Sequence, residues 1–471
     1  MSSGLLRQTL LYSAGEIIPK LIGFILLPVY TAYLSPTDYG IIGYTSSFTM
    51  VLYVLSALSL NSFVIRNYFE LKTEVERQKM IGNIFVFIGI LNLLILILAY
   101  LVLPIFISHF SIKIPWNPYF KLALIINFLD VFSIIPLVMY RVKQQANYFV
   151  LLSLTRVLFQ LGLTFYFVVI RKDGLIGNYL GQLFPLLIYF IVYWVVMIKR
   201  VNINIDLRQI RVALKFSLPL LPGTLAYLAL SFADRVILER YVDVSLIGIY
   251  NVAYMLSLSL NIVIQSGYKA IEPEIFKRYD RPDFAEFIRN IKSLFLFVVY
   301  CGAMFISLYA QEIFKLMASP KFYEGYRLVP IIMVGIIMTG QNVIFGGILT
   351  AEKSTKVIGL STIVGATVNI LFNLLFVKSL GVYAAALSVA ISFATMNYLL
   401  YYRMRFKQKT IKDEILAILL FIFVISILFY IVDVDFSLPM VCVKFFIFIA
   451  FAFLTALIFK LKLRSYKMLI K

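Results

Sequence analysis

Ionisable residues inside apolar stretches are the residues of this sequence best suited to chemistry. A charge at membrane depth is costly, so it usually has a partner or a function. Glu16 and Lys20 lie in the first apolar stretch, Asp130 is in the middle of the fourth, and Asp234 and Arg235 are adjacent in the seventh. Such side chains predict ion binding or proton transfer within a bilayer rather than chemistry in water.

The spacing of Glu16 and Lys20 supports two interpretations. The acid precedes the base by four positions, the favoured order for an ion pair along a helix, so the two charges neutralise each other. Alternatively, they line a cavity and separate to bind an anion. Pro19 and Pro28 interrupt the backbone hydrogen bonds of the same stretch, which keeps both interpretations open.

The other membrane charges also have structural and functional interpretations. Asp130 cannot reach the interface, so it is either a proton or cation site or half of a structural salt bridge. Arg156, in the first turns of the next stretch, is expected to extend to the inner interface. Arg235 and Glu239 have the spacing of an ion pair along a helix, and Asp234 is expected to project elsewhere.

Motifs of catalysis and metal binding are missing from the sequence. It contains no phosphate-binding loop, zinc motif or nucleophile with its base. Cys301 and Cys442 lie far apart in apolar stretches and predict neither a disulfide framework nor a metal site. We therefore expect no enzymatic activity, no catalytic residue, no bound metal and no cofactor. The only expected ions are coupling protons or sodium ions at the membrane acids.

The composition predicts a membrane protein. Of the 471 residues, 62% are hydrophobic and 14% are charged, whereas a soluble protein has about a quarter charged residues. The net charge of +20 does not indicate a nucleic-acid partner, because basic residues gather in the cytoplasmic loops of membrane proteins. The first apolar stretch has the character of a membrane helix, so no cleavable signal is expected.

Apolar runs of about twenty residues recur from end to end and predict an all-α integral membrane protein of about fourteen transmembrane helices. With the N-terminus inside, the cytoplasmic side holds about thirty of the 43 Lys and Arg residues, which predicts that both termini are cytoplasmic. Lys444 begins the last helix and is expected to reach the outer headgroups. The predicted helices cover residues 9–33, 41–64, 80–106, 120–140, 149–170, 176–198, 214–238, 247–267, 291–314, 328–350, 357–377, 382–402, 414–432 and 440–459.

An offset of 208 positions aligns the chain with itself without a gap. The offset spans six helices and returns the chain to the same membrane side, which predicts two parallel six-helix lobes. We place the lobes at residues 1–208 and 209–408, followed by two accessory helices and a tail in 409–471. Aligned glycines and tyrosines at element ends are expected to mark equivalent bends. The aligned identities are Leu10 with Leu218, Gly15 with Gly223, Phe24 with Phe232, Tyr33 with Tyr241, Gly40 with Gly248, and Ile41 with Ile249.

Short motifs follow a characteristic order along the first twelve predicted helices. They are Tyr12-Ser-Ala-Gly-Glu, Leu27-Pro28-Val-Tyr30, Tyr33-Leu34-Ser-Pro-Thr-Asp38-Tyr39-Gly40, Arg66-Asn-Tyr-Phe69-Glu70, Phe216-Ser-Leu-Pro219-Leu-Leu-Pro222, Asp234-Arg235, Ile247-Gly248-Ile-Tyr250, Ala351-Glu-Lys353-Ser-Thr-Lys356 and Leu380-Gly381-Val-Tyr-Ala-Ala-Ala. Each motif is loose, but their joint order resembles the polysaccharide-export flippases (the Wzx-type O-antigen and capsule family).

This resemblance implies the MATE-like fold of the MOP superfamily, with two six-helix lobes around a central cavity and helices 13 and 14 appended. It also implies a bacterial cytoplasmic (inner) membrane and an undecaprenyl-pyrophosphate-linked oligosaccharide as the substrate. Members of the family turn this lipid from the inner to the outer leaflet by alternating access, with an ion gradient as the expected driving force. Glycan polymerase and chain-length proteins are the expected partners, besides membrane lipids.

A pyrophosphate needs cations to leave water, so the resemblance also leads to site predictions. The expected substrate-binding residues are cations facing the cavity, with one at its inner mouth. They are Lys20, Arg156 and Arg235 in the cavity and Arg66 at the mouth. Acids are the expected coupling or gating residues, and these are Glu16, Asp130 and Asp234.

Other classes of membrane protein compete with this interpretation. A MATE-type multidrug or cation antiporter shares the fold, but its cavity should favour acids. A lipid II flippase is a second alternative, distinguished by whether its loss is lethal on its own. A membrane glycan polymerase usually needs large outer loops, which the sequence lacks, and a structural scaffold explains neither the repeat nor Asp130.

Overall fold

The structure is a computed structural model that describes residues 15, 18, 24–202, 205–405, 411–431 and 438–461. The described residues are helical with no β-strand. The chain forms two compact units. The first unit contains Met1–Leu228 and Val242–Gly248, and the second contains Ala229–Tyr241 and Ile249–Lys471.

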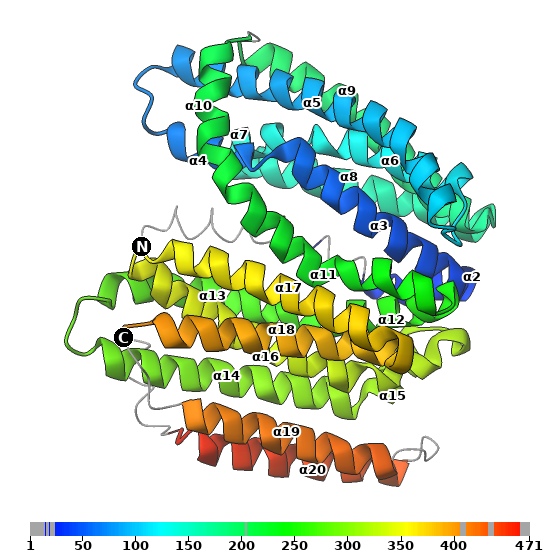
Figure 1. Ribbon diagram of the computed structural model, residues 1–471, viewed down its shortest axis with the longest axis vertical. Coiled ribbons are helices and arrows are strands. Elements are labelled where there is room, and N and C mark those ends of the chain that lie inside the picture. Colours follow the sequence, from blue (N-terminus) through cyan, green and yellow to red (C-terminus); the bar gives the residue numbers. More distant parts are fainter. Residues whose placement is uncertain are drawn as a thin grey trace. The chain divides into compact units, whose positions relative to one another are not determined.

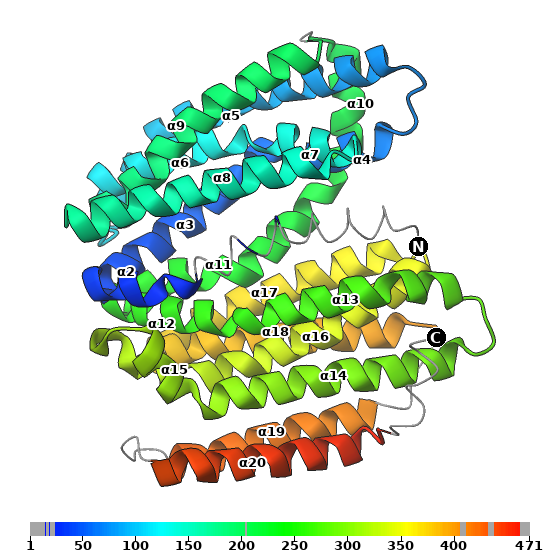
Figure 2. The ribbon, with the colours of Figure 1, turned by 180° about the vertical axis from the view of Figure 1, so that it is seen from behind.

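Long helices of alternating direction make up the first unit, in blue to green in Figures 1 and 2. Helix α9 packs along both α8 and α6, and α10 packs on α4 and α5. The elements are α2 (Leu27–Tyr33), α3 (Pro36–Ala57), α4 (Leu60–Asn67), α5 (Glu74–His109), η1 (Trp116–Phe120), α6 (Lys121–Val131), α7 (Ile134–Val142), α8 (Ala146–Phe165), η2 (Tyr166–Ile170), α9 (Gly174–Arg200), α10 (Leu207–Ser217) and η3 (Leu218–Leu220).

The second unit continues the chain, and α11 (Leu221–Tyr241) and α12 (Val244–Ser257) contribute residues to both units. Helices α16, α17 and α18 pack together, α14 lies on α16, and α19 and α20 pack on the far side of α14 (Figures 1 and 2). The remaining elements are α13 (Ser259–Arg278), α14 (Phe284–Leu308), α15 (Ala310–Met317), η4 (Pro320–Arg327), α16 (Val329–Ala351), α17 (Thr355–Leu380), α18 (Val382–Arg403), α19 (Ile411–Ile431) and α20 (Leu438–Ile458).

Twelve helical segments of the described residues are long and apolar enough to cross a membrane. Each coincides with one of the predicted helices, so the all-α membrane fold is confirmed. The count of fourteen is not confirmed. The first predicted helix, 9–33, lies mostly outside the described residues. The thirteenth is present as α19, although it is not among the twelve segments.

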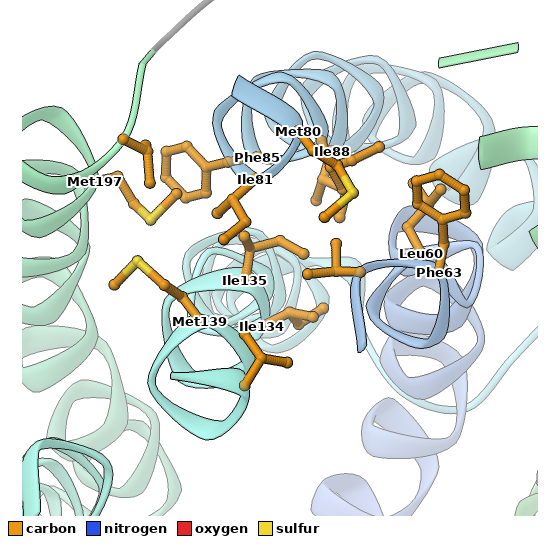
Figure 3. Packing of buried hydrophobic residues seen from close by; sticks show 14 of the residues in the cluster. Leu60, Phe63, Met80, Ile81, Phe85, Ile88, Ile134, Ile135, Met139 and Met197 are labelled. Carbon is orange, nitrogen blue, oxygen red and sulfur yellow. The ribbon is translucent and has the colours of Figure 1, made fainter. Parts of the chain in front are cut away.

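Apolar side chains from helices α3 to α10 pack into a core at one end of the first unit. Figure 3 shows Leu60 and Phe63 of α4 and Met197 of α9 around the side chains of α5 and α7. The end of α6 joins this core through Val131 and the following Phe132, which come directly after Asp130 in the chain. Asp130 is therefore held in place by the packed core that begins at the next residue.

Helix starts recur at the predicted offset, which shows that the internal repeat is structural. Equivalent helices of the two halves begin 208 to 210 positions apart, and Tyr33 and Tyr241 end α2 and α11. The pairs of starting residues are Pro36 with Val244, Glu74 with Phe284, Lys121 with Val329, Ala146 with Thr355, and Gly174 with Val382.

The aligned glycines Gly40 and Gly248 bring the starts of α3 and α12 into contact within the first unit. A Cβ atom on Gly40 would lie 2.0 Å from the carbonyl oxygen of Val244, and one on Gly248 would lie 1.8 Å from that of Pro36. Both glycines are inside helices. The prediction that they mark bends is therefore wrong, and they instead permit a close helix crossing.

Candidate functional site

Asp130 of α6 and Arg156 of α8 form an ion pair near the middle of the first unit's membrane spans. The distance between Arg156 Nη2 and Asp130 Oδ1 is 2.7 Å, and the two side chains are 19% and 33% exposed. The guanidinium thus lies at Asp130, and the predicted extension of Arg156 to the membrane interface is wrong. Of the two interpretations of Asp130, the structure contains the salt bridge.

Hydroxyl groups lie around this pair. Tyr53 and Tyr193 interact electrostatically with both charges. The Tyr189 hydroxyl donates a hydrogen bond to Thr155 Oγ1 at 2.5 Å, one position before Arg156. Arg156 Nε has no hydrogen-bond acceptor among the described residues. The guanidinium therefore keeps a donor to spare beside its bond to Asp130.

Asp234 and Arg235 of α11 form a second ion pair, which is buried. The distance between Arg235 Nη1 and Asp234 Oδ1 is 3.0 Å, and the side chains are 2% and 1% exposed. The Tyr250 hydroxyl of α12 donates to Asp234 Oδ2, and Arg235 Nε donates to Asn251 Oδ1 at 3.2 Å. The expectation that Asp234 projects away from Arg235 is wrong.

Backbone and aromatic groups complete the enclosure of Arg235. Nη1 also donates to the carbonyl oxygen of Ser231 at 2.6 Å. The guanidinium carbon lies 4.8 Å from the Tyr254 ring centroid and 5.3 Å from that of Phe232. A planar guanidinium suits such stacking and forked hydrogen bonding. In this conformation the group is fully engaged inside the second unit, and its predicted contact with substrate stays a prediction.

Arg66 stands near the end of α4 and is the most accessible of the described site residues. Its side chain is 65% exposed, Nε lies 3.7 Å from a carboxylate oxygen of Glu70, and the guanidinium covers the Phe216 ring at 5.2 Å. Leu58 and Ser59, both with left-handed backbone, separate α4 from α3. The predicted residues Glu16 and Lys20 lie outside the described residues.

Two further buried ion pairs were not predicted, and both attach the α19–α20 hairpin to the second unit. Lys292 of α14 pairs with Glu414 of α19, and both side chains are almost fully buried. Lys444 Nζ of α20 lies 2.6 Å from Glu312 Oε1 of α15 and is also buried. The prediction that Lys444 reaches the outer headgroups is wrong. The sequence does contain a signal for these pairs, because each of the two joins a lysine in one apolar helix to a glutamate in another.

The described residues contain no group of three or more His, Cys, Asp or Glu side chains able to hold a metal ion. Several charges within the spans are instead arranged as oppositely charged pairs, among them Asp130 with Arg156, Asp234 with Arg235, and Lys292 with Glu414. Such pairs can bind anions, exchange protons or hold helices together.

Residues 5–278 match the family model described as polysaccharide biosynthesis protein. The chain belongs to this family. A search of curated proteins finds no match. The polysaccharide biosynthesis family match confirms the resemblance to the polysaccharide-export flippases.

Solved structures support the same fold. The lipid II flippase MurJ in its inward closed conformation is 15% identical with a TM-score of 0.69, covering 99% of this chain and 100% of that one. An inward-facing multidrug resistance MATE transporter of the MOP superfamily is 15% identical with a TM-score of 0.65, covering 85% and 94%. An outward-facing multidrug resistance MATE family transporter of the MOP superfamily has a TM-score of 0.56 at 15% identity, covering 86% and 95%. This member of the polysaccharide biosynthesis family is thus a multi-pass membrane protein with the fold of these solved structures.

Proposed function

We propose that the protein translocates undecaprenyl-pyrophosphate-linked oligosaccharide repeat units from the inner to the outer leaflet of the bacterial cytoplasmic membrane. The glycan would serve O-antigen, capsule or exopolysaccharide biosynthesis, beside polymerase and chain-length proteins. Both termini would be cytoplasmic. The family match supports a polysaccharide pathway, and the MOP fold supports alternating access between the two sides of the membrane.

The observation that carries the proposal is the partly exposed ion pair of Asp130 and Arg156. A pyrophosphate is a stronger acceptor for a guanidinium than a single carboxylate, because it offers more charge and a matching bidentate geometry. The substrate therefore displaces Asp130 from Arg156 during binding. Reformation of the pair helps to release the substrate on the other side.

The released Asp130 is the coupling residue of this scheme. A carboxylate that loses its cation at membrane depth is costly to keep charged, so it takes up a proton or a sodium ion. Substrate binding and ion binding are thereby linked at one pair of residues. The buried network of Asp234, Arg235 and Tyr250 acts as a gating element, because its charges are already satisfied within one unit.

Arg66 and Lys20 are further cations that would bind the pyrophosphate besides Arg156. Arg66 gathers the pyrophosphate at the inner mouth, and Lys20 is the further cation that meets it inside. The polyprenyl chain stays in lipid throughout, since moving it through a polar cavity would expose apolar surface to water.

Deletion of the gene in its host tests the proposal. The expected result is the loss of one surface polysaccharide, with its complete lipid-linked repeat unit stranded on the cytoplasmic leaflet. Normal glycan with altered drug or cation tolerance would instead indicate an antiporter. A deletion that is lethal on its own, with lipid II accumulating, would indicate a lipid II flippase.

Complementation of the deletion strain tests the site. Arg156→Ala should fail to restore the glycan at normal expression, and Arg156→Lys should restore it partly. Arg171→Ala is the matched control, since Arg171 also pairs with an acid but is 53% exposed. Full complementation by Arg156→Ala would remove this pair from the mechanism.

A further inference from the structure

An apolar groove runs between α5 and α6 on the surface of the first unit. Its volume is about 320 Å³, and five of its seven lining residues are leucine or isoleucine. The two helices are neighbours, and they contribute residues at helical spacing to each wall. The lining residues are Leu96, Ile97, Tyr100 and Leu101 of α5 and Lys121, Leu124 and Ile125 of α6.

The length of α5 places the groove in the bilayer. The last charged residue at the start of this helix is Lys79. About twenty residues at 1.5 Å each cross the ~30 Å hydrocarbon core, so the helix reaches the far interface near Tyr100. Leu96 lies about one turn deeper than Tyr100. The groove therefore extends from the headgroup region into the acyl chains of one leaflet.

Lys121 marks the headgroup end of the groove. Its ammonium lies 6.0 Å from the Tyr100 ring centroid. The Tyr100 ring in turn packs edge-on against Trp116 at 5.5 Å, as in the aromatic belt of membrane proteins. Among the ion pairs of the described residues, none includes Lys121. A single cation thus stands at the polar end of an otherwise apolar groove.

We propose that this groove is a binding site for an anionic phospholipid of the bilayer, with one acyl chain between α5 and α6 and the phosphate on Lys121. An acyl chain matches the leucine and isoleucine side chains of the walls, and one ammonium matches the single charge of a phosphodiester. The neighbouring basic residue of the same connection, Lys113, donates to the carbonyl oxygen of Val242 at 2.9 Å. The site therefore offers one cation, where a pyrophosphate would need more.

Native mass spectrometry of the purified protein with added phosphatidylglycerol or phosphatidylethanolamine tests whether the charge of Lys121 selects an anionic lipid. We expect the protein to retain phosphatidylglycerol preferentially. Lys121→Gln should reduce that preference by about fivefold, equivalent to ~1 kcal/mol for one interfacial lysine. Lys378→Gln is the control, because Lys378 is an exposed lysine near the end of another membrane helix, α17. An unchanged preference in Lys121→Gln would overturn the proposal.

Filling the groove tests the acyl-chain site separately. Ile97 is exposed, so Ile97→Trp should block the groove without unfolding the protein. It should lower the number of retained phosphatidylglycerol molecules by one, at an unchanged thermal midpoint. Full retention in this variant, or displacement of phosphatidylglycerol by equimolar undecaprenyl phosphate, would show that the groove does not serve bilayer phospholipid.

Discussion

Two ion pairs within the membrane spans differ in their exposure, and this difference separates their roles. Arg235 has its partners in α11 and α12 and is buried, so its charge stabilises the second unit. Arg156 bonds to one carboxylate and remains partly exposed. Breaking a buried pair leaves an uncompensated charge, whereas an exposed pair can exchange partners.

Removal of the Arg235 side chain is predicted to destabilise the protein. Arg235→Ala leaves the Asp234 carboxylate buried without its cation, at a cost of about 3–5 kcal/mol. We expect a lower thermal midpoint in detergent, measured by fluorescence-detected size-exclusion chromatography. Lys378→Ala, at an exposed lysine, should leave the midpoint unchanged. An Arg235→Ala protein as stable as the parent would mean that the pair contributes little to folding.

Removal of the charge on Asp130 is predicted to separate binding from transport. Asp130→Asn frees Arg156 from its competing carboxylate, so the pyrophosphate lipid should bind about tenfold more tightly. Transport should fall, because nothing reclaims the guanidinium from the substrate. Binding to purified protein and surface glycan in the deletion strain measure the two effects. Weaker binding together with weaker transport would show that Asp130 only positions Arg156.

At the scale of elements, backbone contact between α3 and α12 requires glycine. Gly40→Ala and Gly248→Ala each place a Cβ within 2.0 Å of a carbonyl oxygen. The two helices must then separate, so we predict loss of folded protein, measured as monodisperse yield after purification. Gly162→Ala in α8 and Gly359→Ala in α17 are controls, since a Cβ there meets no atom within 4 Å. Normal yields of all four variants would contradict the close crossing.

The α19–α20 hairpin is predicted to depend on its buried ion pairs. Glu414→Ala leaves the Lys292 ammonium buried without its carboxylate, which should lower the thermal midpoint. The double variant Lys292→Met with Glu414→Leu removes both charges and keeps the volume, so it should recover most of the stability. Limited proteolysis in detergent reports the release of the hairpin. No recovery in the double variant would assign the pair a role beyond charge neutralisation.

At the scale of the whole molecule, the distribution of basic residues predicts the orientation in the membrane. In a variant without Cys301 and Cys442, Lys113→Cys should react with a membrane-impermeant maleimide in intact cells. Asp280→Cys, between α13 and α14, should react only after the cells are opened. The reverse pattern would place both termini outside. The predicted lobe boundaries at residues 208 and 408 likewise remain predictions.

The sequence by itself determined the membrane class, most helix positions and the repeat. These features depend on residues close together in the chain, such as a run of about twenty apolar residues that must cross the bilayer. The 208-residue offset is also a property of the linear order, and helix starts such as Pro36 and Val244 follow it. The repeat does not include the charged residues of the site, since the positions 208 residues after Asp130 and Arg156 are Met338 and Val364.

Only the tertiary structure decided which charges are partners. Lys292 with Glu414, Lys444 with Glu312 and Asp130 with Arg156 join different helices, and helix periodicity does not specify which helices become neighbours. It also reassigned Gly40 from a bend to a helix crossing. The physical reason is the low dielectric of the membrane and the protein interior. In such surroundings a charged side chain is stable only beside a partner of opposite charge. Helix packing brings that partner from a distant part of the chain.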